Sequence, residues 1–134
     1  MKKLVAIFTL LFSTTMFSSP AYAEWTKVAS NTAGDSYYID FTRVREHDGY
    51  IYYWRISDYL KPTETGTISS RVYKQASCSL FKTKFLSDTY FKGPMASGEV
   101  NSSSNIPDEG WNYPVPGSVA EGILKVICDK LNQS

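Results

Sequence analysis

The feature that most constrains the fold is a period-two alternation of apolar and polar side chains that runs from Glu24 to Phe91. Alternation of this kind puts the apolar side chains on one face of a β-strand, and short runs of Gly, Asp, Asn and Pro that interrupt it are typical of turns. The pattern predicts five strands, over residues 25–29, 36–41, 50–60, 67–74 and 79–91. Because no helical pattern lies between them, we expect successive strands to pair as an antiparallel meander.

The clearest of these strands covers residues 50–60, and it carries aromatic side chains on both faces. Tyr52 and Trp54 share one face, and Tyr53 and Arg55 share the other. This arrangement is typical of a central strand covered on both sides, or of a strand with one aromatic face exposed for binding. We expect the Tyr52/Trp54 face to belong to the core, and the position of Tyr53 stays open.

The C-terminal third changes character. Residues 92–117 are rich in Gly, Pro and Ser and show no periodicity, which is typical of a functional loop or a partly disordered one. Ser118 and Glu121 have the spacing of a capping box, which predicts that a helix begins there. Leu124 and Ile127 lie within the apolar face of this helix, so we expect both to be buried against the sheet.

The N-terminus has the features of a secretory signal peptide. Lys2 and Lys3 precede an uncharged, mostly apolar run over residues 4–17, and Ala21-Tyr22-Ala23 offers small residues at a cleavage site. The apolar run is also shorter than the roughly 20 residues that a membrane-spanning helix needs. We therefore expect residues 1–23 to be removed and residues 24–134 to form one exported domain.

The composition of the mature chain argues against several function classes. Removal of two lysines with the signal leaves 12 basic and 13 acidic residues, a net charge of −1, which is not typical of a general nucleic-acid binder. The chain has no dinucleotide-binding, phosphate-loop, nucleophile-elbow or zinc-protease motif. Its one histidine, His47, lies in a polar turn, where a catalytic role is not expected. We predict no enzyme activity, no catalytic residue, no metal and no cofactor.

Cys78 and Cys128 are the only cysteines. An even count in an exported chain indicates one disulfide, here between the strand region and the helix. A metal pair or a catalytic thiol is the alternative, although a zinc site needs about four ligands. Closing a loop of this length contributes about 4 kcal/mol in the chain-entropy model. No cysteine follows Ala23 directly, so we expect no lipid anchor and a soluble mature protein.

A basic segment covers residues 66–98, where five basic residues face one acid, for a net charge of +4. Lys82 and Lys84 lie two positions apart on a predicted strand, so they share a face. The segment is typical either of a solvated or edge-protecting sheet surface or of a patch for an acidic partner. Lys82 and Lys84 are the candidate binding residues.

Several segments occur in a characteristic order along the chain: Trp25-Thr-Lys-Val28, Tyr37-Tyr-Ile-Asp-Phe41, Tyr52-Tyr-Trp-Arg55, Asp58-Tyr-Leu-Lys-Pro62, Cys78-Ser-Leu-Phe81, and Trp111-Asn-Tyr-Pro-Val-Pro-Gly-Ser118 with Glu121, Ile123-Leu-Lys125 and Cys128. In these segments the chain resembles the bacterial surface-adhesin protein E-like domain family. The resemblance implies an α+β fold: a bent antiparallel sheet of about five to six strands. It also implies a C-terminal helix on the concave face, joined to the sheet by the Cys78–Cys128 disulfide.

The same resemblance implies a binding function, because the adhesin that names the family lies at the outer surface and binds host matrix and serum proteins. We expect an exported, non-enzymatic binding domain, periplasmic, secreted or at the cell surface, with a protein or polyanionic partner. The alternative is a periplasmic small-ligand-binding or envelope-maintenance protein. A filled core between helix and sheet favours the first, and a polar-lined cavity there of about 300 Å³ or more favours a small ligand or an enzyme.

Overall fold

The computed structural model describes residues 23–132. The predicted signal peptide therefore lies outside the described residues, except for Ala23.

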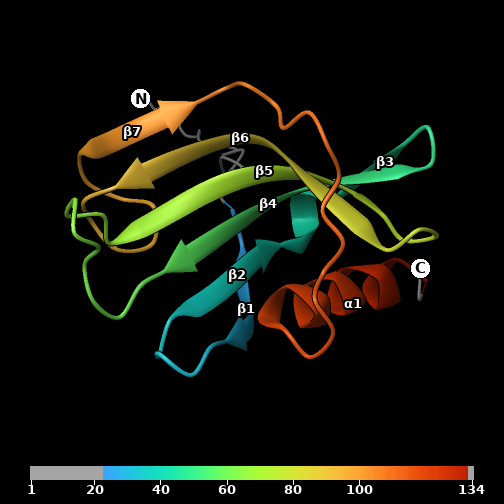
Figure 1. The fold of residues 1–134 in the computed structure, drawn as a ribbon, viewed down its shortest axis with the longest axis horizontal. Coiled ribbons are helices and arrows are strands. Elements are labelled where there is room, and N and C mark those ends of the chain that lie inside the picture. The colour runs from blue at the N-terminus through green and yellow to red at the C-terminus, as the bar shows by residue number, and fades with distance from the viewer. Residues whose placement is uncertain (1–22, 133–134) are drawn as a thin grey trace, which may run out of the picture.

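Seven strands in the described part of the chain form one antiparallel sheet in the order β1-β2-β4-β5-β6-β7, with β3 also paired to β4 (Figure 1). The strands are β1 (Trp25–Ser30), β2 (Ser36–Asp40), β3 (Arg45–His47), β4 (Tyr50–Asp58), β5 (Ser69–Ser77), β6 (Lys82–Phe91) and β7 (Val100–Ser104). A short 3-10 helix, η1 (Phe41–Arg43), separates β2 from β3, and the helix α1 (Val119–Asn132) follows β7. The five predicted strands pair in chain order as β1-β2-β4-β5-β6, all antiparallel, so the predicted meander is confirmed.

Two strands were not predicted. β3 carries no apolar side chain, and all three of its side chains are exposed, so no hydrophobic alternation marks it as a strand. It forms because Asp48 and Gly49, both with positive φ, make a two-residue turn that places His47 directly opposite Tyr50. β7 lies in the stretch predicted to be a loop, and it pairs with β6 at one edge of the sheet. Its mostly exposed Asn and Ser side chains show no alternation from which a strand could be predicted.

The main core lies between α1 and one face of the sheet, which we call the inner face. Ile39, Ile51 and Tyr53 pack there with the helix residues Leu124 and Ile127. Tyr53 is 1% exposed, and burial raises its pKa to about 12. Figure 1 shows α1 beneath the bend of the sheet, beside β1.

The expectation that the Tyr52/Trp54 face belongs to the core is therefore wrong, since α1 covers the Tyr53 face and leaves Tyr52 and Trp54 partly exposed. Alternation assigns side chains to two faces, but it does not say which face a helix 60 or more residues later will cover. Because β4 carries aromatic residues on both faces, the usual contrast between an apolar buried face and a polar exposed face is absent in its sequence.

The start of α1 follows the predicted capping box with one change. The Glu121 amide donates to Ser118 Oγ at 3.2 Å, as expected for the cap. Glu121 Oε1, however, accepts from the Gly117 amide at 3.0 Å, because the Ser118 amide already donates to the Val115 carbonyl. Both contacts satisfy amide groups at the helix start, so the helix begins where the sequence predicted.

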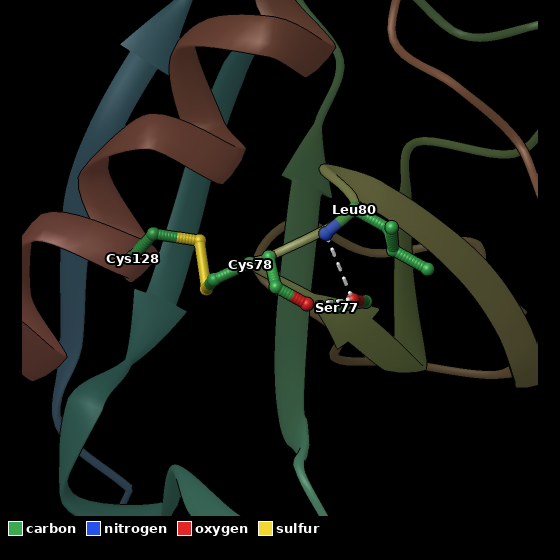
Figure 2. Close-up of a disulfide and its surroundings, with 5 residues drawn as sticks. Ser77, Cys78, Leu80 and Cys128 are labelled. Atoms are coloured by element: carbon green, nitrogen blue, oxygen red, sulfur yellow. Dashed lines mark hydrogen bonds between the residues drawn. A yellow bond between two sulfur atoms is a disulfide. The ribbon is translucent and has the colours of Figure 1, made fainter.

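The predicted disulfide is confirmed: Cys78, just after β5, is bonded to Cys128 on α1 (Figure 2). Cys78 begins the tight turn between β5 and β6, and Ser77 Oγ accepts from the Leu80 amide at 3.2 Å across that turn. The bond joins segments 50 residues apart. It therefore ties the C-terminal half of the helix to the turn at the end of β5.

We predict that Leu124→Ala lowers the free energy of unfolding by about 2–5 kcal/mol, because Leu124 is 1% exposed and its loss leaves a cavity in the main core. Urea unfolding followed by circular dichroism measures this. Val126→Ala is the matched control, since Val126 lies on the same helix at 37% exposure and should cost much less. A change below about 0.5 kcal/mol for Leu124→Ala would show that α1 does not dock as described.

Candidate functional site

The sheet face opposite α1 carries a row of aromatic rings, and we call it the open face. Trp54 and Tyr73 lie on neighbouring strands with ring centroids 4.6 Å apart, and Tyr52 stacks on Tyr73 at 6.2 Å. All three rings are partly exposed, and within residues 23–132 no helix lies over them. Stacked and tilted ring pairs of this kind orient one another, so the three rings form an apolar surface in contact with water.

Two arginines lie against these rings. Arg45 donates from Nη2 to the Tyr73 hydroxyl at 2.8 Å, and its guanidinium lies 5.7 Å from the Tyr52 ring centre. The Arg71 guanidinium lies 5.6 Å from the Trp54 ring centre. Cations at this distance are attracted to the ring face by about 0.5–2 kcal/mol. The rings therefore orient the two positive groups while leaving them able to meet a partner.

Lys82 and Lys84 extend the same surface. Their Nζ atoms lie 4.5 and 4.7 Å from the ring centre of Trp111, which stacks on Tyr50 at 5.4 Å. The backbone of Asn112 pairs with Thr83 through bonds of 2.9 and 2.8 Å, and this pairing places Trp111 beside the two lysines. The predicted sharing of one face by these lysines thus holds in the structure, and their role in binding stays a prediction.

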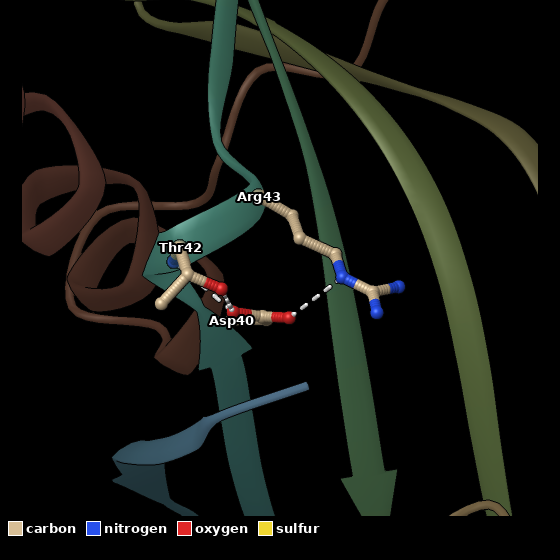
Figure 3. Close-up of polar contacts among 3 residues, drawn as sticks. All are labelled: Asp40, Thr42 and Arg43. Carbon is tan, nitrogen blue, oxygen red and sulfur yellow. Dashed lines mark hydrogen bonds and ion pairs between the residues drawn. The ribbon is translucent and has the colours of Figure 1, made fainter. Parts of the chain in front are cut away.

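The carboxylates nearest to the open face have other local contacts. Asp40, fully buried, caps η1: Oδ1 accepts from the Thr42 amide at 3.0 Å, and Oδ2 lies 3.3 Å from Arg43 Nε (Figure 3). Asp58 Oδ1 accepts from the Met95 amide at 2.8 Å. Besides Arg43, the open face carries four cations: Arg45, Arg71, Lys82 and Lys84. Within residues 23–132 no carboxylate lies within 4 Å of the charged groups of these four side chains. Their positive charge is therefore not neutralised locally.

The basic segment predicted over residues 66–98 divides between environments. Arg71, Lys82 and Lys84 lie on the open face, Lys92 forms an ion pair with Glu99 at 3.0 Å, and Lys74 is buried on the inner face. The bulge between Tyr73 and Lys74 shifts the pairing of β5 with β6 but leaves the alternation along β5 unchanged. Three positions separate Arg71 from Lys74, so in a strand they point to opposite faces.

Sequence reasoning missed Arg45 and Trp111 as members of this surface. Arg45 could have been found by extending the hairpin register from the Asp48–Gly49 turn, which puts Arg45 opposite Tyr52. Trp111 comes from a segment without periodicity, so no local pattern places it. It reaches the open face only through the backbone pairing of the residue that follows it.

The structure adds nothing to favour catalysis at His47. The ring is exposed at the hairpin tip, with Nε2 3.2 Å from the exposed Asp48 carboxylate. In the part of the chain that the structure describes, no group of three or more His, Cys, Asp or Glu side chains could hold a metal ion. None of the described helices is long and apolar enough to cross a membrane.

Comparison with known proteins decides the family. The model of the family described as surface-adhesin protein E matches residues 25–129. The chain belongs to the surface-adhesin protein E family. The resemblance seen in the sequence is thereby confirmed over nearly all of the expected mature chain.

Solved structures of a family member have the same fold. Crystal form II of Haemophilus influenzae protein E superposes with a TM-score of 0.62 at 13% identity, covering 89% of this chain and 99% of that one. Another structure of Haemophilus influenzae protein E gives 0.63 at 12% identity, covering 88% and 95%. No curated protein sequence matches this chain. The structural likeness supports the α+β fold, with its bent antiparallel sheet and C-terminal helix.

The inner face of this surface-adhesin protein E domain is filled under the later turns of α1 and hollow near its start. A cavity of about 510 Å³ lies between the inner face, the segment before α1 and the first turn of the helix. Lys74 and Arg55 line it. Lys74 is 5% exposed, and its Nζ lies 4.3 Å from the Phe85 ring centre. A filled core and a cavity lined by both polar and apolar side chains therefore occur at different positions along one helix.

Burial, with a smaller effect from the nearby Arg55, lowers the pKa of Lys74 to about 7, while Asp108 acts in the opposite direction. Burial also lowers the pKa of Arg55, whose Nε has no hydrogen-bond partner among the described residues. Two positive groups thus share one partly closed space, and the lysine is the one that can lose its charge near neutral pH.

This predicts an unusual pH dependence of stability. The pKa of this lysine is lower in the folded protein than in the unfolded chain, so its charge destabilises the fold. The full cost applies at pH values below the folded pKa, and it disappears as the pH rises toward the unfolded pKa of about 10.5. We therefore expect Lys74→Met to stabilise the domain at pH 6, on the order of 1–4 kcal/mol, with the advantage shrinking above pH 7. Urea unfolding at pH 6, 8 and 10 measures it.

Lys82→Met is the matched control for this series, because Lys82 is a partly exposed cation on the open face and its removal should change stability little at any pH. A Lys74→Met protein that is less stable than the parent at pH 6 would contradict the buried, unpaired state of Lys74.

Proposed function

We propose that this protein is an exported, non-enzymatic, adhesin-like binding protein that recognises an acidic segment of an extracytoplasmic protein through its open face. The observation that carries the proposal is the set of four cations on that face, each held against an aromatic ring and none paired with a carboxylate of the described chain. These are Arg45, Arg71, Lys82 and Lys84. Membership in a family named for surface adhesion supports the same role.

The geometry suits a protein partner for two reasons. Ring contacts restrict the long cationic side chains before binding, so less conformational entropy is lost when a carboxylate meets them. Tyrosine, tryptophan and arginine also supply most of the binding energy in protein interfaces, through apolar contact area combined with directed polar groups. A polysaccharide made only of repeated anionic groups would use the cations and gain less from the rings.

The proposal includes the processing predicted from the sequence. Residues 1–23 act as a signal peptide and residues 24–134 as the binding domain, which works in the periplasm or at the cell surface. An extracytoplasmic partner is consistent with either place. The disulfide supports this, because such bonds persist in oxidising compartments outside the cytoplasm.

The test uses the mature domain against extracellular-matrix and serum proteins, a heparin-like polymer and anionic lipid vesicles, at low and physiological salt. We expect binding to one or more acidic proteins, with an affinity that falls as salt is raised. The double variant Lys82→Glu/Lys84→Glu should bind at least about tenfold more weakly, since two like charges then face the partner.

The matched control is Lys61→Glu/Lys125→Glu, which makes the same change of net charge at exposed positions outside the open face. Circular dichroism must show that both variants fold. Equal loss of binding in both would indicate a general charge effect. That result would overturn the proposed protein-binding face. Unchanged binding after reversal of Lys82 and Lys84 would overturn it too, as would binding only to the heparin-like polymer or the vesicles.

A further inference from the structure

The cavity on the inner face holds an unusual combination of charges. Lys74 and Arg55 line it from neighbouring strands, and neither side chain forms a hydrogen bond or an ion pair with any residue in 23–132. Both positive groups contact aromatic rings: Lys74 lies over Phe85, and Arg55 lies 5.7 Å from the ring centres of Tyr37 and Phe85. Rings offset part of the cost of burying a cation but offer no oxygen acceptor.

A buried positive group without an anion is costly, and the fold can lower that cost in two ways. Lys74 can give up its proton, as its lowered pKa permits. Arg55 cannot, because a guanidinium stays charged in proteins, and its Nε is buried without an acceptor. Deprotonation therefore resolves one of the two charges, while an anion in the cavity would satisfy both.

The other walls of the cavity restrict the chemistry of that anion. Thr83, Asn112 and Ser118 supply polar side chains near the cations, and Phe85, Val115 and Ala120 supply apolar surface. A volume of about 510 Å³ lies within the range of small-molecule sites. Asp108 also lines the cavity, and its carboxylate disfavours a ligand with many negative charges.

We infer that this cavity is a binding site for a small organic oxyanion, a carboxylate or a phosphate monoester with an apolar body, whose charged oxygens meet Lys74 and Arg55. The planar fork of the arginine and the point charge of the lysine suit the two oxygens of such a group. The apolar body lies against Phe85 and Val115. The site is on the inner face, so it is separate from the open face, and each can fail without the other.

The test is a titration of the isotope-labelled mature domain at pH 6, followed by amide NMR. Benzoate and phenyl phosphate are the probes, benzamide is the neutral analogue of benzoate, and inorganic phosphate is the anion without an apolar body. We expect saturable shifts of the Thr83, Phe85 and Asn112 amides with at least one organic anion, with a Kd on the order of 1 mM. Benzamide and inorganic phosphate should bind at least about tenfold more weakly.

Two variants test the site itself. Lys74→Met removes one cation and should weaken binding at least about tenfold. Ala120→Trp keeps both cations but fills the cavity at the first turn of α1, where Ala120 is exposed, and it should abolish the shifts. Lys61→Met, which removes an exposed cation that lies outside both the cavity and the open face, should bind as the parent does.

The inference is overturned if neither organic anion gives saturable shifts, or if benzamide binds as well as benzoate. It is also overturned if Lys74→Met and Ala120→Trp, both shown to be folded, retain the parent affinity. If the parent domain binds the organic anion but shows no protein binding that depends on Lys82 and Lys84, only the open-face proposal fails.

Discussion

The docking of α1 against the inner face is the interaction on which the rest of the structure depends. Leu124 and Ile127 are almost fully buried against Ile51 and Tyr53, and each buried side chain of this size contributes about 1.5–3 kcal/mol by leaving water. The Cys78–Cys128 bond attaches the same helix covalently to the end of β5. Together these contacts decide which of two aromatic faces becomes the core and which meets solvent.

Both faces of the sheet pair aromatic rings with cationic side chains, but the docking of α1 gives these pairs different surroundings. On the open face, aromatic rings lie beside cations that remain accessible, so the charges can serve a partner. On the inner face, Lys74 is buried and Arg55 is half-buried against aromatic rings, and these charges raise the cost of folding. Helix residues fill the inner face near the disulfide. Toward the start of α1 the filling stops and the cavity begins.

Local signals predicted much of this architecture. The alternation along β4, the capping serine of α1 and the paired cysteines each depend on nearby residues or on simple counting, and each is found in the structure. The positions of Lys82 and Lys84 on one face follow from strand geometry alone. The strands β3 and β7 escaped prediction, because their mostly exposed polar residues carry no hydrophobic pattern.

Other features depend on contacts between distant segments, and no local pattern contains them. The burial of Lys74 results from the helix and the segment before it closing over β5. The place of Trp111 results from backbone pairing of a loop with β6. The candidate site was therefore half visible in the sequence: the two lysines could be proposed, but not the tryptophan beneath them or the arginine from β3.

Hydroxyl-radical footprinting of the folded mature domain, read residue by residue, tests most directly which face α1 covers. The account predicts that Tyr53, at 1% exposure, stays unmodified while the partly exposed Tyr52 and Trp111 are modified. Tyr53 should react only after the protein is unfolded in denaturant. Modification of Tyr53 in the folded protein, with Tyr52 and Trp54 protected instead, would contradict the assignment of the two faces.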